Sequence, residues 1–300
     1  MVIAKRLSLL VLLTLAFAPV AEAHPGSGIA VTSDGRVIFV DTGAGVFSIE
    51  RDGRIVRREG RAYHWFALDP AGRFRRTRWP SVPNADFETA GSDPTVILSS
   101  DFPVVVGTDW KFYVPAGGHR DGRIRLLGID PSGKRTVRAI LPPIERGGET
   151  VTWLNGLAAG PSGSIFYTED DAVHKVDARG RVSTVASRVT VPRCARIPAD
   201  EDMTDLLPYL RGLAVASDGS IYVAASGCGA VLRIARDGAT SVVLRTTPPW
   251  SPTAVAVANG EVFVLEYLHT PTDDRREWLP RVRKIGRKGD IRLLGGIRRR

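Results

Sequence analysis

One phrase recurs along this chain: two short apolar runs joined by a tight glycine turn, then a second pair of runs joined in the same way. Its clearest copies are GIAVTSDGRVIFVD, NGLAAGPSGSIFYTED and RGLAVASDGSIYVAAS, which span 28–41, 155–170 and 211–226. Alternating β-branched and aromatic residues bounded by Gly and Asp-Gly turns are typical of β-hairpins. Two hairpins per copy make four strands, and the repetition of a four-stranded unit predicts the blades of a β-propeller.

Aligning the turn glycines adds three weaker copies, which predicts an all-β, six-bladed β-propeller of four-stranded antiparallel blades. The blades form one domain over 24–300 and are expected to begin near residues 27, 64, 101, 155, 211 and 252. The second blade is the weakest, because its first hairpin must come from 63–74 and its outer hairpin from a Pro-rich stretch, 79–94, with only Val96-Ile97-Leu98 typical of a strand. Five blades with an irregular lobe are the alternative.

The first residues have the pattern of a secretory signal peptide over 1–23. Lys5 and Arg6 precede an apolar run, 7–20, and Ala21-Glu22-Ala23 follows it, so we expect cleavage before His24. The run is shorter than the roughly 20 residues that span a bilayer. We therefore expect an exported protein, periplasmic or secreted, with no transmembrane segment after cleavage.

The two cysteines, Cys194 and Cys228, fall in predicted loops at the same end of the repeat. In an oxidising compartment a pair of cysteines more often forms a disulfide than a metal site. We therefore expect a disulfide between them.

The formal net charge of the chain is +9, and a charge of this sign attracts anions. Many arginines alternate along predicted outer strands, where solubility explains them without a ligand. The basic groove with interleaved aromatic residues that nucleic-acid-binding proteins use is missing from the sequence, so no nucleic-acid partner is expected. Nothing in the sequence indicates oligomerisation, and we expect a monomer.

Polar residues gather at one predicted face of the ring. In a propeller blade, the residues before the first strand and after the second strand share a face and surround the central channel. Counting back from the turn glycines gives Ser27, His64, Asp101, Asn155, Arg211 and Pro252, and the ends of the second strands add Asp41, Glu169, Asp170 and Glu266. Convergent polar groups of this kind indicate a ligand site. The predicted ligand-binding residues are His64, Asp101, Asn155, Glu169, Arg211 and Glu266.

The remaining histidines are not assigned to the predicted ligand site. His119 and His269 are expected in solvated loops, and His174 is expected on the surface of an outer strand.

The repeat resembles the NHL-repeat propellers and the gluconolactonase and senescence-marker-protein family, most specifically in Asn155-Gly156-Leu157, Pro161-Ser162-Gly163 and Phe166-Tyr167. The resemblance implies a divalent cation (calcium, zinc or manganese) at the channel mouth, held by a Glu, an Asn and an Asp with a second Asn nearby. That cation polarises a lactone carbonyl, and the Asp helps to activate water.

The family's ligand set carries over only in part. By register, Asn155 matches the ligand Asn and Asp101 matches the second Asn. Ser27, however, stands in place of the Glu, and Arg211 in place of the Asp. A cation beside a metal position opposes metal binding, so the family's lactonase activity does not simply transfer.

Three interpretations of Arg211 stay open. It forms a structural ion pair with Asp101 or Glu169, or its guanidinium holds a carboxylate or phosphate of a ligand, assisted by Asn155 and His64. In the third, acidic side chains rebuild a shifted cation site, for which the predicted metal ligands are Asp101, Asn155 and Glu169. No cofactor is required by the sequence.

The sequence therefore predicts an exported propeller that binds a small anionic molecule or a partner protein at the channel mouth. The alternative is a metal-dependent hydrolase or lyase that acts on a lactone or sugar-acid substrate.

Overall fold

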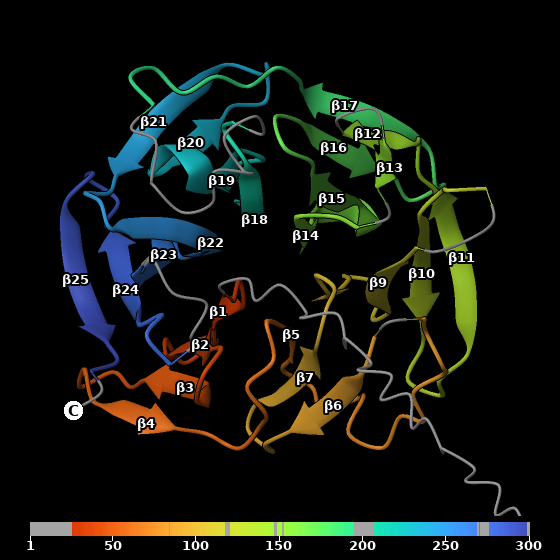
Figure 1. The fold of residues 1–300 in the computed structure, drawn as a ribbon. Coiled ribbons are helices and arrows are strands. Elements are labelled where there is room, and N and C mark those ends of the chain that lie inside the picture. The colour runs from red at the N-terminus through yellow and green to blue at the C-terminus, as the bar shows by residue number, and fades with distance from the viewer. Residues whose placement is uncertain are drawn as a thin grey trace, which may run out of the picture.

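Six β-sheets stand as blades around a central axis (Figure 1). The structure is a computed structural model that describes residues 26–83, 85–117, 121–146, 149–151, 153–194, 207–268, 270 and 276–298. The blades follow one another in chain order, and the last blade contacts the first. This arrangement confirms the predicted all-β, six-bladed propeller.

Five blades are four-stranded antiparallel sheets with sequential strand order. Blade 1 consists of β1 (Ile29–Val31), β2 (Val37–Asp41), β3 (Gly45–Ile49) and β4 (Ile55–Arg57). Blade 3 consists of β8 (Val105–Val106), β9 (Phe112–Ala116), β10 (Arg125–Ile129) and β11 (Arg135–Ile140). Blade 4 consists of β14 (Gly156–Ala159), β15 (Ile165–Thr168), β16 (Val173–Val176) and β17 (Val182–Ala186). Blade 5 consists of β18 (Leu210–Val215), β19 (Ile221–Ala225), β20 (Ala230–Ile234) and β21 (Thr240–Arg245). Blade 6 consists of β22 (Trp250–Ala258), β23 (Glu261–Leu268), β24 (Pro280–Ile285) and β25 (Ile291–Gly296).

The turn of the first hairpin explains why the repeated phrase needs a glycine. Val31 on β1 lies opposite Val37 on β2, and the chain reverses between them. Gly35 adopts a φ of 88°, a conformation that glycine reaches at little cost, and its amide donates a 2.9 Å hydrogen bond to the carbonyl oxygen of Thr32. The turn of blade 3 has the same hydrogen bond, but Trp110 occupies the glycine position with a φ of 58°.

Blade 2 departs from the prediction. Its inner strand, β5 (Trp65–Asp69), pairs with β7 (Thr95–Ser99), and β6 (Phe87–Ala90) is the outer strand of a three-stranded sheet. The expected first hairpin within 63–74 is therefore wrong, because that stretch supplies one strand only. The segment that follows supplies aromatic packing instead: Phe74, which is fully buried, stacks on Trp79 at 5.9 Å, and Trp79 contacts Phe112 of blade 3 at 5.0 Å between ring centroids.

The ring closes through side chains, because blades 1 and 6 share no strand. A continuous apolar core joins them, including Phe39 of β2 and Leu265 of β23. Two hydrogen bonds cross the same boundary. The hydroxyl of Thr253 donates to the carbonyl oxygen of Gly26 at 2.8 Å, and the hydroxyl of Tyr267 donates to that of Val40 at 2.7 Å.

The structure also contains shorter elements. β12 (Ile144–Arg146) and β13 (Glu149–Val151) form a separate two-stranded sheet after blade 3. Among the described residues, the short 3-10 turns η1 (Pro161–Gly163) and η3 (Ser226–Cys228) lie in blades 4 and 5.

The predicted disulfide is present. Cys194, after the outer strand of blade 4, is bonded to Cys228 in η3 of blade 5, with Cα atoms 4.6 Å apart. Among the residues that the structure describes, no helix has the length and apolar character to cross a membrane. The predicted signal peptide, His24, His119 and His269 lie outside the described residues.

Candidate functional site

The inner strands of all six blades enclose a central cavity of about 320 Å³. The side chains on its walls are almost entirely aliphatic or aromatic, and backbone polar groups of the inner strands also face it. Representative lining residues are Val31, Phe66, Val105, Leu157, Leu213 and Val255. Ser27 is the polar side chain on this lining, at the end of the channel from which the first strand starts.

The hydroxyl of Ser27 is an unusual feature of this channel. Ser27 is 6% exposed, and its Oγ has no hydrogen-bond partner among the described residues. A buried hydroxyl without a partner costs free energy. This atom is therefore available to a molecule that enters the channel.

Asn155 and Arg211 are brought together by the contact between blades 4 and 5. Asn155 Nδ2 donates a 3.0 Å hydrogen bond to Asp170 Oδ1, and the hydroxyl of Thr168 donates a 2.8 Å bond to the carbonyl oxygen of Arg211. The amide of Leu210 donates to the carbonyl oxygen of Asp170 at 2.8 Å. Gly156 allows this close approach, since a Cβ there would lie 2.5 Å from the carbonyl oxygen of Arg211. Asn155 and Arg211 are both buried.

Arg211 places a guanidinium where water is largely excluded. Burial lowers the pKa of Arg211, and the nearby Tyr209 and Tyr267 oppose that shift. The guanidinium carbon lies 6.0 Å from the centre of the Tyr209 ring. Burial also raises the pKa of Tyr267, with a further increase from Asp41 and a decrease from Arg211. Side chains of blades 5, 6 and 1 thus interact electrostatically near the start of the inner strands.

His64 joins blades 1 and 2 at this face. Its Nδ1 lies 2.7 Å from the carbonyl oxygen of Ser100, and its own carbonyl oxygen accepts a 2.9 Å hydrogen bond from the amide of Ser27. The backbone of His64 is therefore held beside Ser27, while its imidazole is held against the backbone of Ser100.

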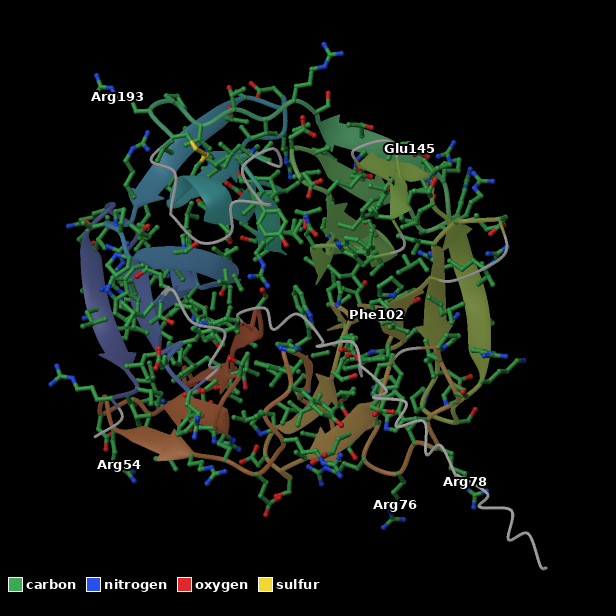
Figure 2. All side chains as sticks on the ribbon, viewed as in Figure 1. Arg54, Arg76, Arg78, Phe102, Glu145 and Arg193 are labelled. Atoms are coloured by element: carbon green, nitrogen blue, oxygen red, sulfur yellow. A yellow bond between two sulfur atoms is a disulfide. The ribbon has the colours of Figure 1, made fainter. Side chains whose placement is uncertain are left out.

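Asp101 lies outside the lining of the central channel. Its carboxylate accepts a 2.6 Å hydrogen bond from the hydroxyl of Ser100, and it borders a separate hollow of about 410 Å³ beside Trp79 and Phe87. Because Trp110 is the turn equivalent of Gly35, the count from the turn places Phe102, and not Asp101, at the register of Ser27. Phe102 is buried, and in Figure 2 it lies on the inner side of the ring, whereas Arg54, Arg76, Arg78 and Arg193 extend from the periphery.

Glu169 and Glu266 are engaged within their own blades. Glu169 Oε1 lies 3.1 Å from His174 Nε2 on the adjacent strand. His174 was expected on the surface, but it is mostly buried and stacks on Tyr167 at 4.8 Å, because β16 packs its side chain against β15. Glu266 is fully buried and binds the guanidinium of Arg281 at 2.5 Å and that of Arg283 at 2.5 Å.

The donors required for a family-type metal site do not converge in the described part of the chain. No group of three or more His, Cys, Asp or Glu side chains there is arranged to hold a metal ion. Of the three predicted metal ligands, Asp101 borders another hollow, Glu169 faces His174, and Asn155 donates a hydrogen bond to Asp170. These residues do not fit the implied cation.

Sequence reasoning missed two features of the mouth. Tyr267 lies near the end of β23, one residue after Glu266, which holds in blade 6 the register of Asp41 in blade 1. Its place directly after that acid was the available signal. The apolar channel was also missed, although the first strands read Ile29-Ala30-Val31 and Leu157-Ala158-Ala159, with no polar residue on either face.

Comparisons with known proteins support the fold. No protein-family model matches the chain, and no curated protein matches its sequence. Regucalcin from Agrobacterium tumefaciens, described as a calcium-binding protein, matches with a TM-score of 0.51 and 14% identity over 84% of this chain and 85% of that chain. An inactive variant of virginiamycin B lyase from Staphylococcus aureus, solved with quinupristin, matches with a TM-score of 0.50 and 13% identity over 91% and 85%. Luciferin-regenerating enzyme matches with a TM-score of 0.50 and 12% identity over 87% and 92%.

At these identities the likeness is one of fold. It confirms the predicted resemblance to the gluconolactonase and senescence-marker-protein propellers at that level, and it assigns neither a substrate nor a metal.

Proposed function

We propose that this protein binds a small amphipathic anion at the mouth of its central channel. The observation that carries the proposal is the buried side chain of Arg211, a residue that directly precedes Gly212 on the wall of a cavity of about 320 Å³ whose side chains are almost all apolar. The anionic group of the ligand meets Arg211, and its apolar body enters the channel.

The chemistry of the mouth supports a carboxylate or a comparable anion. A guanidinium pairs with a carboxylate through two parallel hydrogen bonds, and the pair is stronger where water is excluded. The hydroxyl of Ser27 offers a further donor on the channel wall. Because Asn155 Nδ2 donates to Asp170, the side-chain oxygen Oδ1 of Asn155 is the atom that accepts a hydrogen bond from a ligand hydroxyl.

Titration with hexanoate, octanoate and decanoate tests this function by isothermal calorimetry. Each added CH₂ that enters the channel contributes about 0.8 kcal/mol, so affinity should rise about four-fold per CH₂ until the channel is filled. Arg211→Gln should weaken octanoate binding at least ten-fold, whereas Arg236→Gln, which removes the same charge from an exposed turn of the same blade, should not. Equal binding of octanol and octanoate, or an unaffected Arg211→Gln protein, would overturn the proposal.

A metal-dependent hydrolase or lyase acting on a lactone or sugar acid is the second candidate, supported by a fold shared with a lyase. The discriminating measurement is lactone hydrolysis and thermal stability after EDTA treatment and after addition of calcium, zinc or manganese. A metal response in both assays, with turnover lost in Asn155→Ala, would replace the binding function by the enzymatic one. A partner protein in place of a small ligand would be indicated if a co-purifying chain is released by Arg211→Gln.

Export and a monomeric state belong to the same proposal. The signal pattern over 1–23 and the disulfide between Cys194 and Cys228 support an oxidising compartment. Recovery of a shortened chain outside the cytoplasm tests export, and light scattering tests the monomer.

A further inference from the structure

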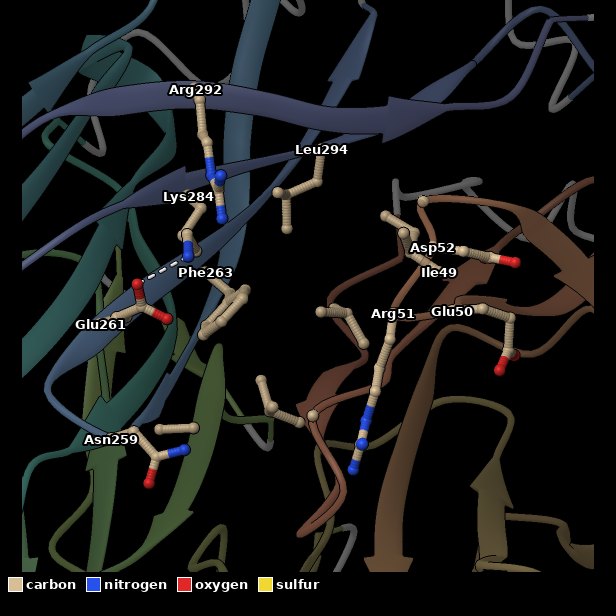
Figure 3. Close-up of a pocket in the computed structure, with 15 residues that line it drawn as sticks. Ile49, Glu50, Arg51, Asp52, Asn259, Glu261, Phe263, Lys284, Arg292 and Leu294 are labelled. Atoms are coloured by element: carbon tan, nitrogen blue, oxygen red, sulfur yellow. Dashed lines mark hydrogen bonds and ion pairs between the residues drawn. The ribbon is translucent and has the colours of Figure 1, made fainter.

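A second cavity, of about 340 Å³, lies where the first and last blades meet (Figure 3). Its lining includes the turn residues Gly35 and Gly53 of blade 1 and Asn259 of blade 6. The cavity therefore opens at the hairpin-turn face, at the other end of the blades from Ser27. It lies on the one blade boundary that joins the two ends of the chain.

The blade 6 wall carries a row of cross-strand neighbours. Phe263 on β23 lies opposite Lys284 on β24, which lies opposite Arg292 on β25. Lys284 is 9% exposed, and its ammonium binds Glu261 at 2.6 Å, so its charge is matched within the wall. Arg292 forms no ion pair or hydrogen bond with any residue that the structure describes. An anion beside Arg292 would therefore supply a partner that the described wall does not.

The blade 1 wall adds apolar surface and a second guanidinium. Ile49 faces the gap, and Arg51 runs along it, with its Nε donating to the carbonyl oxygen of Asp34 (Figure 3). The acids on either side of Arg51 are engaged elsewhere and point away from the gap (Figure 3). Glu50 accepts a 2.6 Å hydrogen bond from the hydroxyl of Ser48, and Asp52 pairs with Arg54 at 3.5 Å. Lys284 and Glu261 neutralise each other and Asp52 pairs with Arg54, so Arg51 and Arg292 are the lining cations that have no ion-pair partner among the described residues.

We infer that this cavity between blades 1 and 6, the seam cavity, is a second binding site, independent of the channel, for a small anion with a flat apolar body. The apolar body packs between Ile49 and Phe263, with Leu294 beside them, and the anionic group lies beside Arg292. A cavity of this size and mixed lining is typical of small-molecule sites. Because such a ligand touches both blades at a boundary without shared strands, its binding also stabilises the closed ring.

Titration with 1-naphthoate tests the inference, using calorimetry and thermal melting. For a ligand of this size we expect a Kd of about 1 mM or tighter and a rise in melting temperature with naphthoate concentration. Arg292→Gln should weaken binding at least ten-fold, and the neutral 1-naphthamide should bind similarly weakly to the wild type. Arg57→Gln is the matched control, since it removes the same charge from an exposed position on the outer strand of blade 1.

A second variant separates this site from the channel. Leu294→Glu places a carboxylate in the half-buried wall of the seam, so it should abolish naphthoate binding at the seam while leaving octanoate binding to the channel unchanged. Failure of octanoate to bind would overturn the proposed channel function alone. Absence of naphthoate binding to the wild type, or equal binding to the wild type, Arg292→Gln and Leu294→Glu, would overturn the seam site alone.

Discussion

The hydroxyl of Tyr267 in the last blade donates a 2.7 Å hydrogen bond to the backbone carbonyl oxygen of Val40 in the first blade. This bond crosses a boundary that no strand spans, and both groups are removed from water. Tyr167 is a contrasting case: its side chain is equally buried, but its hydroxyl has no hydrogen-bond partner in the described part of the chain. Two buried tyrosines of the same propeller thus differ in what their hydroxyl groups contribute to the stability of the fold.

Replacing each tyrosine by phenylalanine should separate the two cases. Tyr267→Phe leaves the Val40 carbonyl oxygen without its partner, which should lower the free energy of unfolding by about 1 to 3 kcal/mol. Tyr167→Phe removes an unsatisfied buried hydroxyl and should be neutral or slightly stabilising. Urea denaturation at neutral pH measures both. Equal losses in the two variants would contradict the assigned role of the Tyr267 hydroxyl in ring closure.

Stability should fall at alkaline pH because of the buried tyrosines. Burial raises the pKa of Tyr113, Tyr167 and Tyr267 above the usual value of 10.0, with added contributions from Asp109, Glu169 and Asp41 respectively. Above pH 10 the unfolded chain therefore releases these protons while the folded chain retains them. The stabilisation is complete below pH 10 and is lost as the pH rises further, by up to about 1.4 kcal/mol per pH unit for each tyrosine.

Unfolding free energies measured between pH 8 and 11.5 check this dependence. Tyr167→Phe serves as the control, because it removes one of the three groups and should reduce the slope above pH 10 without changing stability at pH 7. An unchanged slope in that variant would show that other groups cause the alkaline loss.

The turns explain why the blades could be predicted from the sequence while one register could not. Gly35 and Gly163 both mark positions of positive φ, so counting back from them correctly placed Ser27 and Asn155 at equivalent points. In blade 3, Trp110 adopts the positive φ in place of glycine. A count that relies on glycine therefore shifted by one residue, to Asp101 in place of Phe102.

The candidate site was predicted less well, because a polar residue at the right register does not reveal its partners. Glu266 ends the inner hairpin as expected, but Arg281 lies opposite it on the next strand and binds it. Glu169 similarly meets His174. The available signal was the residue that neighbours each acid on the next strand. It would have predicted that both acids bind a side chain of their own blade and not a ligand.

Loss of the disulfide should destabilise the fold. Cys194 and Cys228 are separated by 34 positions, and closing a loop of this length contributes about 4 kcal/mol in the chain-entropy model. The double variant Cys194→Ser/Cys228→Ser should therefore melt several degrees below the wild type. Dithiothreitol should lower the melting temperature of the wild type towards that of the variant and leave the variant unchanged; a wild type indifferent to the reductant would contradict this.

Glu266 should matter for stability and not for ligand binding. Its carboxylate is fully buried between Arg281 and Arg283, so Glu266→Ala leaves two largely buried cations without their partner and should cost about 3 to 5 kcal/mol. Glu88→Ala, which removes a partly exposed acid from the exposed Arg61, should cost less than about 1 kcal/mol. Chemical denaturation compares the two variants. Glu266→Gln, which keeps the shape of the side chain, should bind octanoate as the wild type does; a stable Glu266→Gln protein that had lost octanoate binding would return Glu266 to the channel site.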